Sequence, residues 1–193
     1  MTIRTLLLFA AASAALGLSA CNGFQAPSVF GLGKEVAATK LTVSASSVGP
    51  LTAETPFSRE AVAAVLPGYD VEADSRSTEG MSVPALRVSR ERRTVMTIFG
   101  SGDKVERIHV VDEAIATRRE TIGRTFSDNL GDREMPGCAP GIEEASGKVL
   151  CQAFDAPNVR LIYTGDWAGP DGELPPPDIL AVWTLDSILW VAP

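Results

Sequence analysis

The chain has 193 residues, and its 24 acidic side chains outnumber its 17 basic ones, which gives a formal net charge of -7 at pH 7. This acidic balance argues against nucleic acid as a main partner, because phosphate backbones are bound by clusters of cations. About 170 residues remain beyond the N-terminal segment, a length that fits one domain.

The N-terminus has the pattern of a bacterial lipoprotein signal. Arg4 precedes an apolar run over residues 6–18, which is shorter than the roughly 20 residues of a membrane-spanning helix. The run ends in Leu-Ser-Ala-Cys at residues 18–21, a lipobox pattern. We therefore predict that residues 1–20 are a cleaved signal peptide and that Cys21 carries lipid. An ordinary secretory signal with an incidental cysteine is the alternative.

Acylation of Cys21 would place the protein on a membrane. Each buried methylene contributes about 0.8 kcal/mol, so two or three acyl chains hold a protein there almost permanently. Lipoproteins kept at the inner membrane often carry Asp directly after the cysteine, whereas this chain has Asn22. We predict the periplasmic side of the outer membrane, with residues 21–38 as the lipidated N-terminus and flexible tether and an unknown envelope protein as a second partner.

Two cysteines remain once Cys21 is assigned to the lipid. Cys138 and Cys151 would lie in an oxidising compartment, where a pair of this kind predicts a disulfide. A bond closing a loop of this size contributes on the order of 3 kcal/mol. Zinc is the alternative, but it takes four ligands and the chain has one histidine. We expect no metal and no cofactor.

Residues 39–193 are predicted to form an α+β periplasmic domain. Leu41 and Val43 indicate a short strand before the turn at Gly49. Start and stop signals predict one helix over residues 55–66 and a second, short one near residue 125. Alternating patterns predict strands at residues 69–73, 85–89, 94–99, 105–111, 149–154, 159–164 and 185–191.

The order of these elements suggests a repeat. Phe57-Ser58 and the Leu-Pro-Gly at 66–68 are followed, 69 positions later in each case, by Phe126-Ser127 and the Met-Pro-Gly at 135–137. We therefore predict two helix-plus-antiparallel-meander units forming one compact domain, with tentative repeats at 50–115 and 120–193 and an internal duplication as the explanation.

The loop after residue 164 carries the strongest candidate site. Asp166, Trp167, Asp171 and Glu173 lie within nine residues and form a candidate binding loop. A structural loop with a docked indole is the simplest interpretation. Calcium binding, carbohydrate contact and hydrolysis by paired carboxylates stay open. We assign no catalytic residue and no metal ligand.

Three other features have simpler explanations. His109 alternates with apolar neighbours, so it is expected on the opposite face of its strand, as a solvated or packed histidine rather than a catalytic one. The arginine-rich stretch 87–93 indicates a charged strand edge or hairpin, with an acidic docking partner as the alternative. Trp183 and Trp190 are predicted to belong to the core.

Several stretches resemble the RpoE-regulated lipoprotein family of Gram-negative bacteria. They are residues 48–56, the Gly-x-Trp-x-Gly-Pro-Asp-Gly loop at 165–172, the Cys138/Cys151 pair, and residues 187–190. The resemblance implies an outer-membrane lipoprotein of the sigma-E envelope-stress response with no established enzymatic activity. The Ser/Pro-rich segment 75–84 departs from the family pattern.

These observations favour a non-enzymatic binding or envelope-maintenance module anchored under the outer membrane. Two alternatives remain. One is an enzyme acting on an envelope polymer such as peptidoglycan. The other is an inhibitor of a periplasmic enzyme, by analogy with the architecture of the beta-lactamase-inhibitor proteins.

Overall fold

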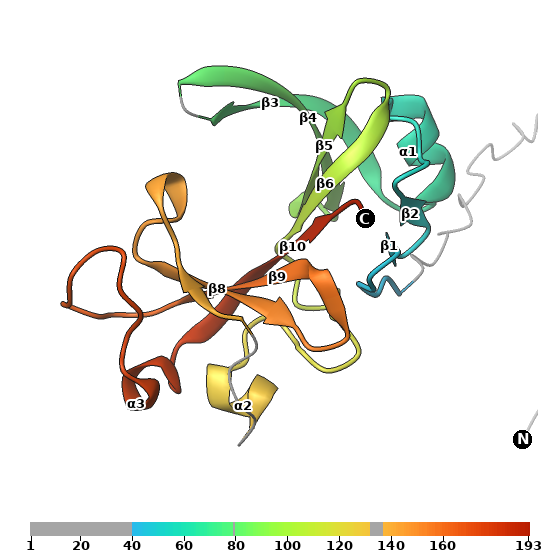
Figure 1. Cartoon of the computed structure of the whole chain (residues 1–193). Helices are drawn as coiled ribbons and strands as arrows, with labels where there is room; N and C mark the ends of the chain where they lie inside the picture. Colours follow the sequence, from blue (N-terminus) through green and yellow to red (C-terminus); the bar gives the residue numbers. More distant parts are fainter. Residues whose placement is uncertain (1–39, 79, 132–136) are drawn as a thin grey trace, which may run out of the picture. The chain divides into compact units, whose positions relative to one another are not determined.

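A single antiparallel sheet of eight strands dominates the described part of the chain. The computed structural model describes residues 40–78, 80–131 and 137–193 (Figure 1). The sheet order is β3-β4-β5-β6-β10-β9-β8-β7. Its strands are β3 (Asp70–Thr78), β4 (Met81–Arg90), β5 (Arg93–Ser101), β6 (Lys104–Val110), β7 (Ala139–Pro140), β8 (Lys148–Ala153), β9 (Ala156–Thr164) and β10 (Thr184–Val191). A separate hairpin pairs β1 (Ser47–Val48) with β2 (Leu51–Thr52).

The core lies on one face of this sheet because apolar side chains meet in register across neighbouring strands. One row of partners runs through seven strands, and every member is buried. This row consists of Val71, Val88, Met96, Val110, Ile188, Leu161 and Cys151. Since side chains alternate between the faces of a strand, the rows on either side of this one point away from the core.

The C-terminal strand β10 sits in the middle of the sheet, between β6 and β9. Its Trp190 is fully buried opposite Ile108 of β6. The Trp190 indole Nε1 donates a hydrogen bond to the carbonyl of Ala45, at 3.2 Å. The segment that starts the described chain therefore packs on the same face of the sheet as the core.

Three short α-helices occur in the described residues: α1 (Arg59–Val65), α2 (Phe126–Leu130) and α3 (Pro177–Leu180). A single 3₁₀ turn, η1, covers Glu143–Ala145. Ser58 and Thr125 cap α1 and α2 by accepting hydrogen bonds from backbone N–H groups three residues on. Helices of this length are unstable alone, so they depend on packing against the sheet.

The predicted α+β fold class, with two helix-plus-antiparallel-meander units, is wrong. The described chain is mostly β, and eight of its ten strands form one continuous sheet rather than two units. Start and stop signals located α1 and α2, but the helices have only seven and five residues. A capping signal fixes where a helix begins and says little about how much of the domain it forms.

The strands were largely found, although their lengths differ from the prediction. β3 and β4 extend through the predicted turn region 74–84 and pair from Asp70–Ser89 to Thr78–Met81. The predicted strand at Leu41 and Val43 is reduced to isolated bridges, in which Thr42 pairs with Ala116 and Val43 with Val48. β5 pairs with β4 only from residue 85 onward, so the outer part of the β3–β4 hairpin is a two-stranded arm, visible at the top of Figure 1.

Several predictions lie outside the described residues. They include the signal peptide at 1–20, the lipidation of Cys21, the tether at 21–38, and the Met-Pro pair at 135–136 of the second repeat motif. In the part of the chain that the structure describes, no helix has the length and apolar character needed to cross a membrane.

The predicted disulfide is confirmed. Cys138 and Cys151 are bonded across 13 positions, with an S–S distance of 2.02 Å. Cys151 is fully buried in the core row of the sheet, and Cys138 packs beside it. The bond therefore fixes the chain that enters β7 against β8.

Removing this bond is expected to destabilise the domain. The double variant Cys138→Ala/Cys151→Ala should lose on the order of 3 kcal/mol of unfolding free energy, because the unfolded chain gains a loop that the bond had closed. Urea unfolding of both proteins measures the difference. Dithiothreitol should lower the unfolding free energy of the wild type by a similar amount and leave that of the variant unchanged. A wild-type unfolding free energy that does not respond to the reductant contradicts the prediction.

Candidate functional site

The Trp167 loop, residues 165–173, leaves the end of β9 and packs its indole inward. Trp167 is half-buried and lies against the hydrophobic core. The loop contains Gly165, Gly169 and Gly172, of which only Gly172 has a positive φ, at 80°. The indole of Trp167 is thus docked against the core, which is the packing that the structural-loop interpretation describes.

Two of these glycines allow close contact with tryptophans. A Cβ added at Gly169 would lie 2.0 Å from Cζ2 of Trp167, and one at Gly165 would lie 2.3 Å from Cδ1 of Trp183. Both distances are far below van der Waals contact. Glycine is required at these positions because the rings occupy the space that a side chain would need.

The loop borders a hollow of about 180 Å³. Its other wall consists of Gly147 in the β7–β8 connection and Lys148 at the start of β8. Trp183 also lines the hollow. The Ser146 hydroxyl donates a hydrogen bond of 3.4 Å to the Asp171 carboxylate, and this bond joins the two walls. A concave site formed by two loops on a rigid sheet is a common place for ligands to bind.

The structure brings the predicted loop residues together. Asp166, Trp167, Asp171 and Glu173 all line this hollow. The three carboxylates nevertheless form no group of three metal-binding side chains, a statement that holds for the described residues. A cation at this loop would therefore need backbone carbonyl or water oxygens in addition to its carboxylates.

Trp183 supplies an additional polar group that the sequence did not suggest. Its side chain is 3% exposed, as expected for a core residue, but its indole Nε1 has no hydrogen-bond partner among the described residues. Buried polar groups are normally paired. The Trp183 Nε1 is enclosed by the surrounding atoms, so this donor stays unsatisfied within the described residues.

His109 lies on the face of the sheet opposite the core, as predicted. Its row of partners runs through Arg87, Thr97, Leu189 and Arg160. The His109 Nε2 is buried and unpaired within the described chain. Burial is the main cause that lowers its pKa below 6.5, and the charges of Lys148 and Arg76 add to this effect while Asp186 opposes it.

The arginine-rich stretch is a hairpin, in line with the first of its two interpretations. Glu91 and Arg92 have positive φ values of 52° and 65° and form the turn between β4 and β5. Arg87 forms an ion pair with Glu72 at 2.7 Å on the neighbouring strand. An exposed pair of this kind contributes little to stability.

Sequence reasoning missed a buried polar cluster on the core side. Glu120, Asn129 and Tyr163 are all buried. The Asn129 side chain accepts a hydrogen bond from the backbone N–H of Thr121 at 2.9 Å and donates one to the Thr121 carbonyl at 3.3 Å. Burial raises the pKa of Tyr163, whose hydroxyl lies beside Asn129 without a well-formed hydrogen bond. The Thr117-x-x-Glu120 spacing, typical of a capping turn, is the signal that points to Glu120.

The fold and the hollow define a class: an antiparallel β domain whose described residues hold one disulfide and a surface hollow bordered by loops. The chain belongs to the family described as "Protein of unknown function (DUF1131)", whose pattern matches residues 34–192.

Two comparisons agree with this family. The chain is 31% identical over 150 residues to "Uncharacterized protein YfeY" of Escherichia coli (strain K12), covering 77% of this chain and 78% of the relative. It also resembles a solved structure, "Crystal structure of the uncharacterized protein yfeY from Escherichia coli", with a TM-score of 0.66 and 30% identity. That match covers 79% of this chain and 99% of the solved one. These relatives support the fold and leave the activity open.

The close packing of Trp167 on the loop can be tested with Gly169→Ala. The added Cβ would collide with the indole, so we expect a loss of about 1–3 kcal/mol in unfolding free energy, typical of overpacking. Tryptophan fluorescence and urea unfolding measure the change. Ala168→Ser, at the exposed neighbouring position, is the matched control and should change stability by less than about 0.5 kcal/mol; equal effects of the two substitutions would contradict the packing.

His109 predicts a specific dependence of stability on pH. Its pKa is lower in the folded protein than in the unfolded chain, so below pH 6.5 the unfolded chain binds a proton that the folded protein does not. Stability should therefore fall as the pH drops below 6.5 and level off below the folded pKa. The measurement is the unfolding free energy of the wild type relative to His109→Gln. If the unfolding free energies of the two proteins change in parallel with pH, the prediction for His109 is refuted.

Proposed function

We propose that this protein is a non-enzymatic binding module held at the periplasmic side of the outer membrane by lipid on Cys21, and that the Trp167 loop forms its contact surface. The anchor follows from the signal and lipobox pattern at residues 1–21. The disulfide between Cys138 and Cys151 is consistent with an oxidising compartment.

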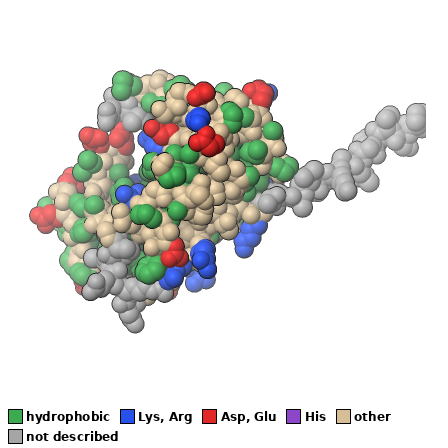
Figure 2. Space-filling view, turned by 45° about the vertical axis from the view of Figure 1, so that its right-hand side comes forward, with side chains coloured by type: hydrophobic (Ala, Val, Ile, Leu, Met, Phe, Trp, Pro, Cys, Tyr) green, Lys and Arg blue, Asp and Glu red, His purple; other side chains and the backbone are tan. Residues whose placement is uncertain are grey.

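The observation that carries the binding role is the hollow beside the Trp167 loop. It combines the half-buried aromatic ring of Trp167 with the three carboxylates of the loop and with glycine-rich segments on both walls. Aromatic rings with a few placed polar groups are typical of binding sites. On the face drawn in Figure 2, apolar side chains occur in small groups separated by polar ones, so this face has no broad apolar patch that would compete as a docking surface.

The role in envelope maintenance rests on the resemblance of residues 48–56 and 165–172 to the RpoE-regulated lipoprotein family. In this role, the protein would be produced during envelope stress and would hold an envelope partner near the outer membrane. The Trp167 loop, which carries part of the resemblance, is also the proposed contact surface.

One observation favours a second candidate, an enzyme acting on an envelope polymer such as peptidoglycan. Asp166, Asp171 and Glu173 line the same hollow, and pairs of carboxylates hydrolyse glycosidic bonds. The inhibitor alternative loses its basis, because its architectural analogy required helix-plus-meander units that the sheet topology does not contain.

The contact surface can be tested by crosslinking in envelope membranes followed by purification of the tagged protein. Trp167→Ala should reduce recovery of a specific partner at least about tenfold, as expected for an aromatic hot spot. Phe154→Ala removes another partly exposed aromatic, 50% exposed and outside the hollow, and is the matched control. Equal recovery with both variants would remove the loop from the proposal.

The anchor is tested separately with Cys21→Ser. This variant should leave the membrane fraction, because the lipid can no longer be attached. If it remains membrane-bound, the anchor assignment fails.

The enzyme candidate has its own test. The purified full-length protein is incubated with peptidoglycan, and soluble fragments are measured by chromatography. Release of fragments that is lost in Asp166→Asn or Glu173→Gln would replace the binding proposal with the enzyme.

A further inference from the structure

Glu120 is a buried carboxylate without an ion-pair partner. The residue is 2% exposed. It accepts a hydrogen bond from the Thr117 hydroxyl and a long one, at 3.4 Å, from the backbone N–H of Phe154. Among the described residues, no cation lies within salt-bridge distance of it. An ionised carboxylate offers about four acceptor positions, and buried charges are normally paired, so Glu120 retains unused acceptor capacity.

A second hollow, distinct from the one at the Trp167 loop, lies beside this carboxylate. Its volume is about 180 Å³ and Glu120 lines it. Val43, Ala45, Ala153 and Ala156 provide small apolar surfaces in the same hollow. The volume corresponds to about six waters in the liquid. The space therefore suits a small molecule with one short apolar group.

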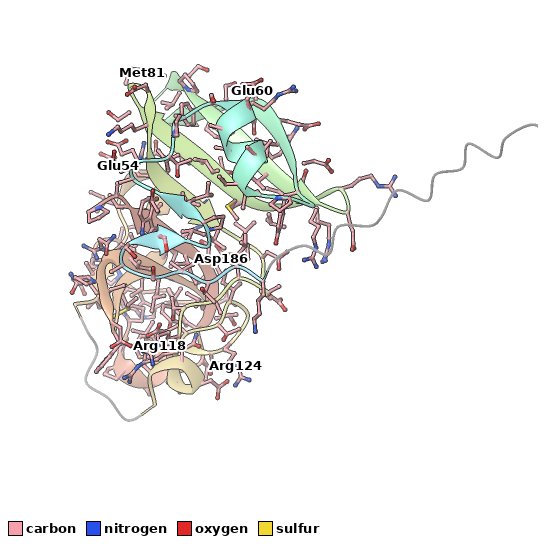
Figure 3. All side chains as sticks on the ribbon, turned by 90° about the vertical axis from the view of Figure 1, so that its right-hand side faces the viewer. Glu54, Glu60, Met81, Arg118, Arg124 and Asp186 are labelled. Atoms are coloured by element: carbon pink, nitrogen blue, oxygen red, sulfur yellow. A yellow bond between two sulfur atoms is a disulfide. The ribbon has the colours of Figure 1, made fainter. Side chains whose placement is uncertain are left out.

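Two arginines also line this hollow, but only one of them forms an ion pair within the described chain. Arg119 pairs with Asp155 at 3.1 Å, and its guanidinium lies 4.2 Å from the centre of the Phe154 ring. Arg118 is exposed and has no hydrogen bond or ion pair within the described chain. Figure 3 labels Arg118 at one end of the domain, at the same end as Arg124. The hollow thus combines a buried anion with an unpaired cation.

We propose that this hollow binds a small zwitterion, namely an α-amino acid with a short side chain. The ammonium group donates hydrogen bonds to the Glu120 carboxylate, and the carboxylate accepts from the Arg118 guanidinium. The side chain lies against Ala153 and Ala156. This site uses neither the lipid anchor nor the Trp167 loop, so the inference is independent of the proposed function.

The charges favour a zwitterion over singly charged molecules. Asp155 also lines the hollow and pairs with Arg119, so Glu120 and Arg118 are the two charged groups left for a ligand. A simple amine satisfies Glu120 but leaves Arg118 unpaired. A simple carboxylate pairs with Arg118 and is repelled by Glu120. Only a molecule that carries an ammonium and a carboxylate close together complements both Glu120 and Arg118. The unpaired or repelled charge disfavours simple amines and simple carboxylates.

The first test uses the purified full-length protein and isothermal titration with L-alanine and D-alanine. We expect saturable binding with one site per chain for at least one of them. N-acetylalanine lacks the ammonium group and alaninamide lacks the carboxylate, so each should bind about tenfold or more weakly. Absence of alanine binding, or equal binding of N-acetylalanine, overturns the proposal.

The second test assigns the binding to this hollow. Arg118→Gln and Glu120→Gln should each weaken alanine binding about tenfold or more. Arg124→Gln removes another exposed arginine from the same end of the domain, outside the hollow, and should leave binding unchanged. Thermal unfolding of each variant checks the fold. If Glu120→Gln fails to fold, Arg118→Gln and the two alanine analogues decide, and binding unaffected by Arg118→Gln refutes the site.

Discussion

The pairing of β10 with β6 is the constraint on which the rest of the structure depends. Val110 faces Ile188 and Ile108 faces Trp190 across this pair, and all four are fully buried. Without it, β3–β6 and β7–β9 would be two separate ribbons with exposed apolar faces. Because β10 is the last strand of the chain, this contact joins residues about 80 positions apart, and such long-range pairing is slow to form.

The central position of β10 also sets where the two hollows lie. The chain that precedes β10 carries Trp183 against the Trp167 loop, which places the first hollow at the β8–β9 side of the sheet. Residue 45 accepts the Trp190 hydrogen bond on the core face and also lines the second hollow beside Glu120. Both hollows are thus bordered by irregular segments that the sheet holds in place, an arrangement that favours binding.

Local patterns located most elements, since alternation, caps and turn residues act over a few positions. Ser58 and Thr125 mark the two capped helices, and the glycine-free runs near residues 95 and 160 mark central strands. The fold class was wrong because the number of capped helices says nothing about how strands from distant parts of the chain join. The β3–β4 arm was missed because its polar side chains carry no apolar alternation, while its backbone still pairs.

The sequence by itself determined the disulfide partners, the inward position of Trp190 and the gathering of Asp166, Trp167, Asp171 and Glu173 in one loop, because these depend on composition and short spacing. Only the tertiary structure decided that the loop borders a hollow, that Trp183 is buried with its N–H unpaired, and that Glu120 lies buried beside Arg118 and a second hollow. Those features arise where segments distant in sequence meet, and no local pattern encodes the contacts that leave a buried polar group without a partner.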